Sequence, residues 1–146
     1  MPARSSFDYA IVRVIPHVER GECVNVGVIL FCRTRRYLGM RVEIDERRLR
    51  ALAPDLDVDA VAGYLTGLQR VCAGDPDAGP IARLAQAERF HWLVAPSSTV
   101  VQPSPVHSGL CVRPGDALDE LMATLVRPPA ASASVADEET GRAPGK

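Results

Sequence analysis

The sequence predicts an α+β fold, in which a small, mostly antiparallel sheet carries three to four packed helices. Two patterns indicate this class. The first 45 residues alternate at the two-residue period of strands, with short connections between them, which is typical of a three-stranded meander. The residues that follow switch to the 3.6-residue period of helices, with one further short strand expected at the edge of the sheet.

The three strands of the meander are expected over residues 7–14, 23–32 and 37–45. The first is rich in β-branched and aromatic side chains, and the third alternates like a half-buried strand. The second is apolar on both faces, which predicts a central strand covered on both sides. Its period-two pattern places Val24, Val26, Val28 and Leu30 on one face and Cys23, Asn25, Gly27, Ile29 and Phe31 on the other.

Helices are expected after the meander. Asp45 can cap a short helix that ends at Pro54, and Asp57 can begin a longer one that stops at Gly74. Two more helices are expected over residues 81–92 and 116–126. Between them, Thr99–Gln102 fits a short strand, which Pro103 and Pro105 restrict to the edge of the sheet because proline cannot donate to a central ladder.

Length and composition suit one domain with a tail. The 146 residues are 47% hydrophobic, enough for a core in a domain predicted over residues 1–127. Residues 128–146 are dominated by Pro, Ala, Ser, Gly and Glu without periodicity, which predicts a disordered tail. The sequence contains neither a signal-peptide pattern nor a long apolar run, so a cytoplasmic protein without membrane contact is expected.

The segment Trp92–Gly109 is the most distinctive part of the chain, because it combines prolines with short polar side chains. Three interpretations stay open for it: a structural corner with self-capping turns, an edge that receives an extended peptide, and hydrolase chemistry using Ser104 and His107. The last lacks a Gly-x-Ser-x-Gly elbow and a third group. The candidate binding residues of this segment are Ser97, Ser98, Gln102, Ser104 and His107.

Two further candidates lie in the meander. Arg20, in the connection between the first two strands, can grip a phosphate or carboxylate with two hydrogen bonds, or simply belong to a solvated loop. Asn25 lies within an apolar strand, where a buried amide must find a partner, either in the adjacent loop or in a ligand. Gly27 follows on the same predicted face and allows another backbone to approach closely.

Two long segments resemble a known family. They are YAIVRVIPHVERGECVNVGVILFC, residues 9–32, and ERFHWLVAPSSTVVQPSPVHSG, residues 88–109. Together they closely resemble the bacterial family catalogued as domain of unknown function 3037, over roughly residues 7–127. The resemblance implies no established activity or cofactor. Members of that family are often encoded beside HipA-like kinases, and this association implies an accessory or partner role.

Charge and cysteine usage narrow the functional classes. The net charge is −1, but residues 1–50 carry +4 and residues 51–128 carry −4, which suits a charge-complementary partner. Arginines gather at residues 33–36 and at Arg41, Arg47, Arg48 and Arg50 and can contact phosphates, although acidic residues lie among them. The four cysteines and three histidines lack metal-ligand spacing, so neither a metal nor a cofactor is predicted.

Three functional hypotheses follow. The first is a non-catalytic protein-binding or accessory module, with a HipA-like kinase as partner. The second is an enzyme or binder for a small phosphorylated or carboxylated ligand, with Arg20, Asn25, Ser104 and His107 in one cleft. The third is nucleic-acid binding through the arginine-rich hairpin.

Overall fold

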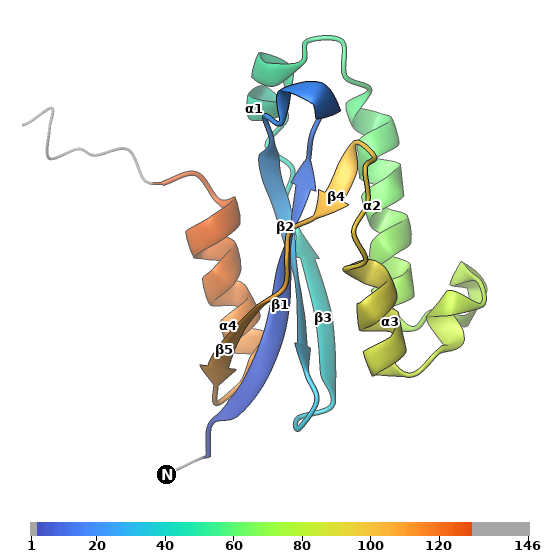
Figure 1. Cartoon of the computed structure of the whole chain (residues 1–146), viewed down its shortest axis with the longest axis vertical. Coiled ribbons are helices and arrows are strands. Elements are labelled where there is room, and N and C mark those ends of the chain that lie inside the picture. The colour runs from blue at the N-terminus through green and yellow to red at the C-terminus, as the bar shows by residue number, and fades with distance from the viewer. Residues whose placement is uncertain (1–2, 130–146) are drawn as a thin grey trace, which may run out of the picture.

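Five antiparallel strands form a sheet at the centre of the structure (Figure 1), a computed structural model that describes residues 3–129. The strands are β1 (Ser5–Val14), β2 (Val24–Cys32), β3 (Tyr37–Val42), β4 (Val101–Pro103) and β5 (His107–Cys111). Their order is β3-β2-β1-β4, and β5 also pairs with β1. The α+β class and the meander are therefore confirmed, and the predicted edge strand is β4.

The strand β5 is not predicted by the sequence. Its residues, including Ser108 and Gly109, have low strand propensity and follow Pro105, so they read as a loop. Tertiary pairing with Ser5–Tyr9 makes them a strand. Gly109 suits this position, since a Cβ atom there would come within 2.6 Å of the Phe7 ring.

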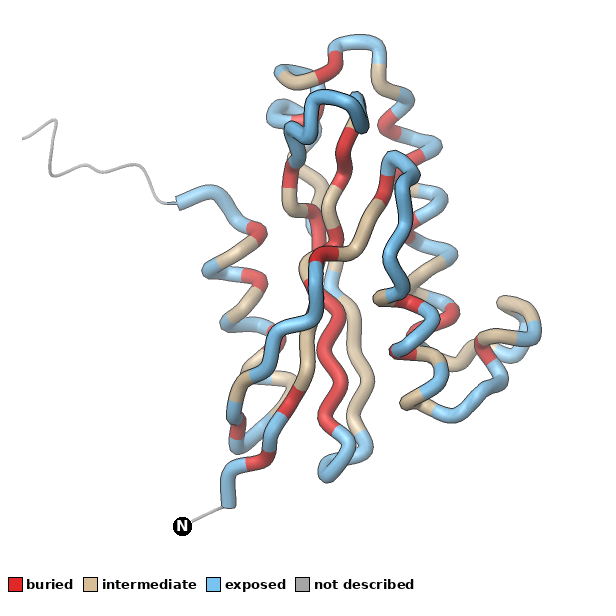
Figure 2. Tube along the Cα trace, in the orientation of Figure 1, coloured by how far each residue is buried: buried red, intermediate tan, exposed pale blue. Residues whose placement is uncertain are grey.

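Helices cover both faces of the sheet. On one face lie α1 (Glu46–Leu52), α2 (Val58–Ala73) and α3 (Gln86–Leu93), whose apolar side chains share a buried cluster with β1 and β2. On the other face lies α4 (Pro114–Leu121), which continues into a π-helical turn, Met122–Val126, and packs on a second cluster. Figure 2 shows the consequence for β2, which is buried along nearly its whole length, as predicted.

A β-bulge in β2 changes the predicted faces of that strand. Val12 pairs with Gly27, but Arg13 pairs with Asn25, so Val26 of β2 is left without a partner in the register. Val24 and Val26 consequently join Ile29 and Phe31 in the cluster under α2, whereas Val28 and Leu30 face α4. The period-two pattern was wrong across this point, and Asn25 and Gly27 do not share a face.

The helix boundaries follow from local chemistry. Asp45 accepts a hydrogen bond from the Arg48 amide, and Asp57 accepts one from the Ala60 amide. Both aspartates are therefore N-caps, as predicted. Gly74 ends α2 in the left-handed conformation. The helix predicted over residues 81–92 is instead a 3-10 turn, Ile81–Arg83, followed by α3, because Leu84 adopts an extended conformation between them.

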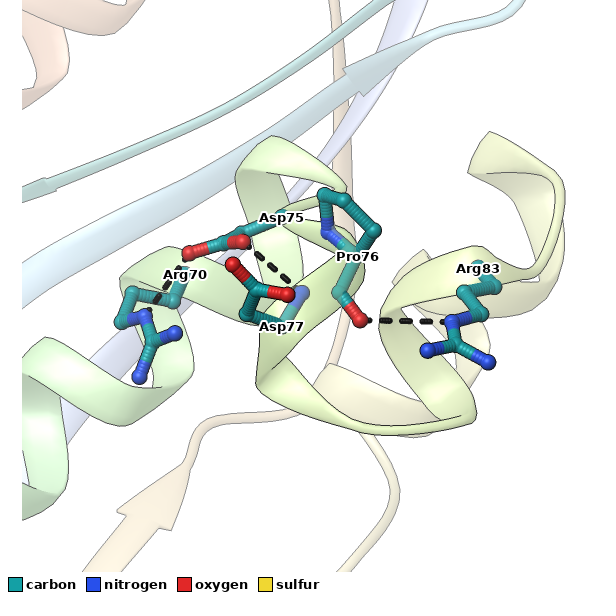
Figure 3. A network of polar contacts seen from close by, with 5 residues as sticks. All are labelled: Arg70, Asp75, Pro76, Asp77 and Arg83. Atoms are coloured by element: carbon teal, nitrogen blue, oxygen red, sulfur yellow. Dashed lines mark hydrogen bonds and ion pairs between the residues drawn. The ribbon is translucent and has the colours of Figure 1, made fainter.

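A polar network links the end of α2 to the turns that follow (Figure 3). The Asp75 carboxylate accepts hydrogen bonds from the Asp77 amide at 2.9 Å and the Arg70 Nε at 2.9 Å, and Arg83 donates to the Pro76 carbonyl. The Asp77 amide, and after it Arg70, hold the pKa of Asp75 below its usual value. The ionised Asp75 carboxylate therefore stabilises the folded state at neutral pH. This stabilisation is lost as the pH falls through the lowered pKa of Asp75.

The predicted boundary of the domain stays a prediction. Of the tail predicted over residues 128–146, only Pro128 and Pro129 lie within the described residues. Between residues 3 and 129, no helix combines the length and the apolar character that a membrane span requires.

Candidate functional site

The segment 92–109 becomes one edge of the sheet. Within it, β4 pairs with Val12–Val14. Further along, His107–Gly109, the first part of β5, pairs with Phe7–Tyr9. The same side of β1 therefore carries two successive short strands, joined by residues 104–106 (Figure 1). This edge separates two surfaces, one toward α2 and one on the α4 side of the sheet.

Ser104 attaches this edge to β1. It is buried, its amide donates to the Ile11 carbonyl at 2.7 Å, and its hydroxyl oxygen accepts from the Ile11 amide at 2.8 Å. The hydroxyl itself donates to the Pro105 carbonyl at 2.9 Å. His107 instead packs against Tyr9 in a tilted arrangement, with 5.4 Å between ring centroids. The Ser104 proton is thus committed to a backbone carbonyl and not to His107, so the two residues do not form a nucleophile and base pair in this structure.

Replacing Ser104 by alanine is expected to destabilise the domain by about 1–3 kcal/mol, because the Ile11 amide loses its acceptor inside the sheet. Urea denaturation followed by circular dichroism measures this loss. Ser98, which is exposed in the same segment, is the matched control, and its replacement by alanine should change stability by less than about 0.5 kcal/mol. Equal effects of the two substitutions would contradict the anchoring role of Ser104.

The remaining polar residues of the segment bond mostly to one another. The hydroxyls of Ser97 and Thr99 are 2.8 Å apart, and Thr99 also donates to the Val101 carbonyl at 2.8 Å. Gln102 Nε2 donates to the Thr99 carbonyl at 2.8 Å. These contacts are the self-capping turns typical of Ser and Thr beside prolines.

Asn25 has a structural partner far away in the sequence. Its Nδ2 donates to the Leu125 carbonyl at 3.0 Å, which ties β2 to the π-helical turn after α4 and not to the adjacent loop. On the sheet, Asn25 pairs with Arg13, and Arg13 pairs with Gln102. The structure therefore places two predicted site residues, Asn25 and Gln102, on either side of Arg13, which the sequence did not single out.

Arg20 does not join these residues. It lies in the exposed 3-10 turn Val18–Arg20 after β1 and forms an ion pair with Glu22. Ser104 contacts Ile11, His107 contacts Tyr9 and Asn25 contacts Leu125. Contacts between the described residues thus do not gather Arg20, Asn25, Ser104 and His107 into one cluster.

Three arginines of the β2–β3 hairpin contact other residues of the domain. Arg35 donates to the Ala3 carbonyl at 2.9 Å and to the Ser5 hydroxyl at 3.2 Å. The Arg33 guanidinium lies over the Phe31 ring, 5.9 Å from its centroid. Arg41 pairs with Asp119 at 3.3 Å. Nucleic-acid binding through this hairpin stays a prediction.

A groove runs between α2 and the residues before β4. Its main cavity, of about 390 Å³, has mostly apolar walls, and we call it the α2–β4 groove. The residues that line it are Leu56, Asp57, Ala60, Val61, Tyr64, Thr99, Val100 and Val101. A second cavity of about 200 Å³ shares Tyr64 and Val101 with it and reaches Trp92 and Ser97.

Large apolar side chains around the groove are exposed. Tyr64 is 53% exposed, Trp92 45% and Val100 37%. The sequence does not single out Tyr64, although Ala60 and Tyr64 are four residues apart and lie next to the buried Val61 on the helical period of α2. Neighbouring exposed apolar side chains around a concavity are typical of a binding surface.

The part of the chain that the structure describes contains neither a cluster of metal-ligand side chains nor a disulfide. There, no three His, Cys, Asp or Glu residues lie close enough to hold a metal ion. The four cysteines are free thiols, and only Cys23 is exposed. Burial raises the pKa of Cys72 to about 12, so this thiol stays protonated and unreactive at neutral pH.

The fold and the groove together define a small α+β domain with helices on both faces of an antiparallel sheet and an apolar surface beside one edge. A family model described as "Protein of unknown function (DUF3037)" matches residues 9–126, and the chain belongs to this family. Comparison with curated proteins and with solved structures finds no match.

Proposed function

We propose that the chain is a non-catalytic protein-binding module whose α2–β4 groove receives apolar side chains of a protein partner. The observation that carries the proposal is the combination of a cavity of about 390 Å³, lined by exposed Tyr64 and Val100, with exposed Trp92 in the adjoining smaller cavity. Aromatic anchors in a desolvated concavity dominate the energy of protein interfaces. A charged small substrate would find few polar partners on these walls.

The charge around the groove favours a partner segment with basic residues beside its apolar ones. Asp55, Asp57 and Asp59 lie around the start of α2, and Asp57 lines the groove itself. The ion pairs between residues 3 and 129 do not include these three carboxylates. Lysine or arginine side chains of a partner would therefore steer its association and strengthen it at low salt.

A HipA-like kinase is the partner that we propose, because the family resemblance implies a gene association with such kinases. The binding of the purified kinase to this chain is measured by calorimetry. Val100→Glu places a carboxylate in the apolar groove and is expected to weaken binding by at least about ten-fold. Leu110→Glu is the matched control, since Leu110 is 64% exposed and lies in β5, outside the lining of the groove.

Two outcomes would contradict the proposal. A wild-type chain that does not bind the kinase at micromolar concentrations excludes this partner. Equal weakening by Val100→Glu and Leu110→Glu excludes the groove as the docking site, because only one of the two positions lines it.

A further inference from the structure

A row of three polar side chains crosses the sheet on the face opposite the α2–β4 groove. Asn25 on β2, Arg13 on β1 and Gln102 on β4 are partners in the strand register. Side chains of paired residues lie on the same face of a sheet, and the Asn25 contact with Leu125 places this face on the side of α4. All three side chains are half-buried.

The guanidinium group of Arg13 has fewer hydrogen-bond acceptors than it has donors to place. One of its terminal nitrogens, Nη2, donates to the Pro103 carbonyl at 3.1 Å. Its Nε is buried and has no hydrogen-bond acceptor among residues 3–129. The ion pairs between those residues also do not include Arg13. A half-buried guanidinium normally has an anion beside it, because removing a charge from water is costly without one.

The side-chain amides of Asn25 and Gln102 can each donate a further hydrogen bond. An amide nitrogen carries two protons, and the side-chain hydrogen bonds of Asn25 and Gln102 use one each, to the Leu125 and Thr99 carbonyls. The main contacts of α4 and the turn after it are with β2 and β3, and Arg13 and Gln102 on the neighbouring strands keep part of their surface exposed. Beside Arg13 on the same strand face lie Ile11 and Tyr9, both half-buried, and His107 packs against Tyr9.

We propose that Arg13, flanked by Asn25 and Gln102, is the anchor of a carboxylate-binding site on this sheet face. A single guanidinium with two neutral amides matches one negative charge, so a carboxylate fits better than a phosphate dianion, which needs more cations. The apolar strip toward Tyr9 would cover the hydrocarbon part of the ligand. The carboxylate belongs to a small organic acid or to an acidic side chain of a protein, and the two sources share this chemistry.

The test observes the Arg13 Nε–H group directly by 1H-15N NMR of the full chain, with its signal assigned by its loss in Arg13→Lys. Sodium benzoate is the probe for a small acid, and an acetylated, amidated Leu-Glu-Leu peptide is the probe for an acidic side chain. We expect saturable shifts of the Arg13 signal by benzoate, by the peptide or by both, with a dissociation constant on the order of 1 mM for benzoate. Benzamide, which lacks the charge, should not shift it.

Variants separate a site from general charge attraction. Asn25→Ala should weaken benzoate binding about ten-fold, because a charge-assisted hydrogen bond is lost. Arg20→Lys is the matched arginine control and should leave the affinity unchanged, since Arg20 is exposed and paired with Glu22. Val100→Glu should also leave it unchanged, which keeps this test independent of the groove.

Three results would overturn the proposal. The first is an Arg13 signal that neither probe shifts. The second is an equal response to inorganic phosphate or benzamide. The third is an equal loss of affinity in Arg20→Lys and Asn25→Ala. A response to the peptide alone assigns the site to an acidic protein segment, and a response to benzoate alone assigns it to a small acid.

Discussion

Replacing Leu118 by alanine is expected to destabilise the domain by about 2–5 kcal/mol, the range for removing a fully buried leucine from a core. Leu118 is 0% exposed and is the buried residue of α4. It belongs to the cluster formed with Val28 and Leu30 on the second face of the sheet. The cost combines the lost burial free energy of the removed atoms with the cavity that alanine leaves.

Urea denaturation monitored by circular dichroism measures this effect. Leu110→Ala is the matched control, because Leu110 is 64% exposed and its loss should change stability by less than about 0.5 kcal/mol. If Leu118→Ala cost no more than Leu110→Ala, the packing of α4 on the sheet described above would be wrong.

Replacing Gly27 by alanine is expected to destabilise the domain by about 1–3 kcal/mol, the range for forcing extra volume into a packed site. A Cβ atom at this position would lie 2.5 Å from the Arg41 carbonyl oxygen of the neighbouring strand. That oxygen belongs to the backbone of β3 and cannot rotate away as a flexible side chain would. The two strands must separate locally, which weakens the ladder next to the bulge.

The control for Gly27 has the opposite expected sign. Gly63 lies inside α2, is exposed, and has no atom within 4 Å of the place where a Cβ would stand. Alanine there should stabilise the domain by about 0.5–1 kcal/mol, because it favours the helix over the unfolded chain. Thermal or urea unfolding of the two variants checks both signs, and a stabilising Gly27→Ala would contradict the close approach of β2 and β3.

The elements with local causes were predictable. Hydrogen bonds to residues only a few positions away fix the helix ends at Asp45, Asp57 and Gly74. These ends can therefore be predicted from the local sequence. The helical break at Leu84 was missed, because Leu84 and Ala85 carry no proline or glycine signal. The strand β5 was missed because its pairing partner, β1, lies about a hundred residues away.

The sequence identifies several residues of the candidate site but not the contacts that they make. The prolines and hydroxyls of segment 92–109 fit a structural corner or an edge strand, and fit an active-site loop less well, because no elbow motif or third catalytic group accompanies them. The bonds of Ser104 to Ile11 and of Asn25 to Leu125, which decide what these side chains do, span 93 and 100 residues. The role of Tyr64 likewise depends on Val100 and Val101, which α2 meets only after folding.

The sequence by itself determined the α+β class, the doubly covered β2 and most helix limits, because periodicity and capping act over one or two turns of chain. Tertiary structure alone decided that a bulge turns Asn25 toward α4, that Arg13 stands between Asn25 and Gln102, and that an apolar groove opens beside β4. These features depend on strand register and on contacts between distant segments. The alternation of residues along one strand does not contain that information.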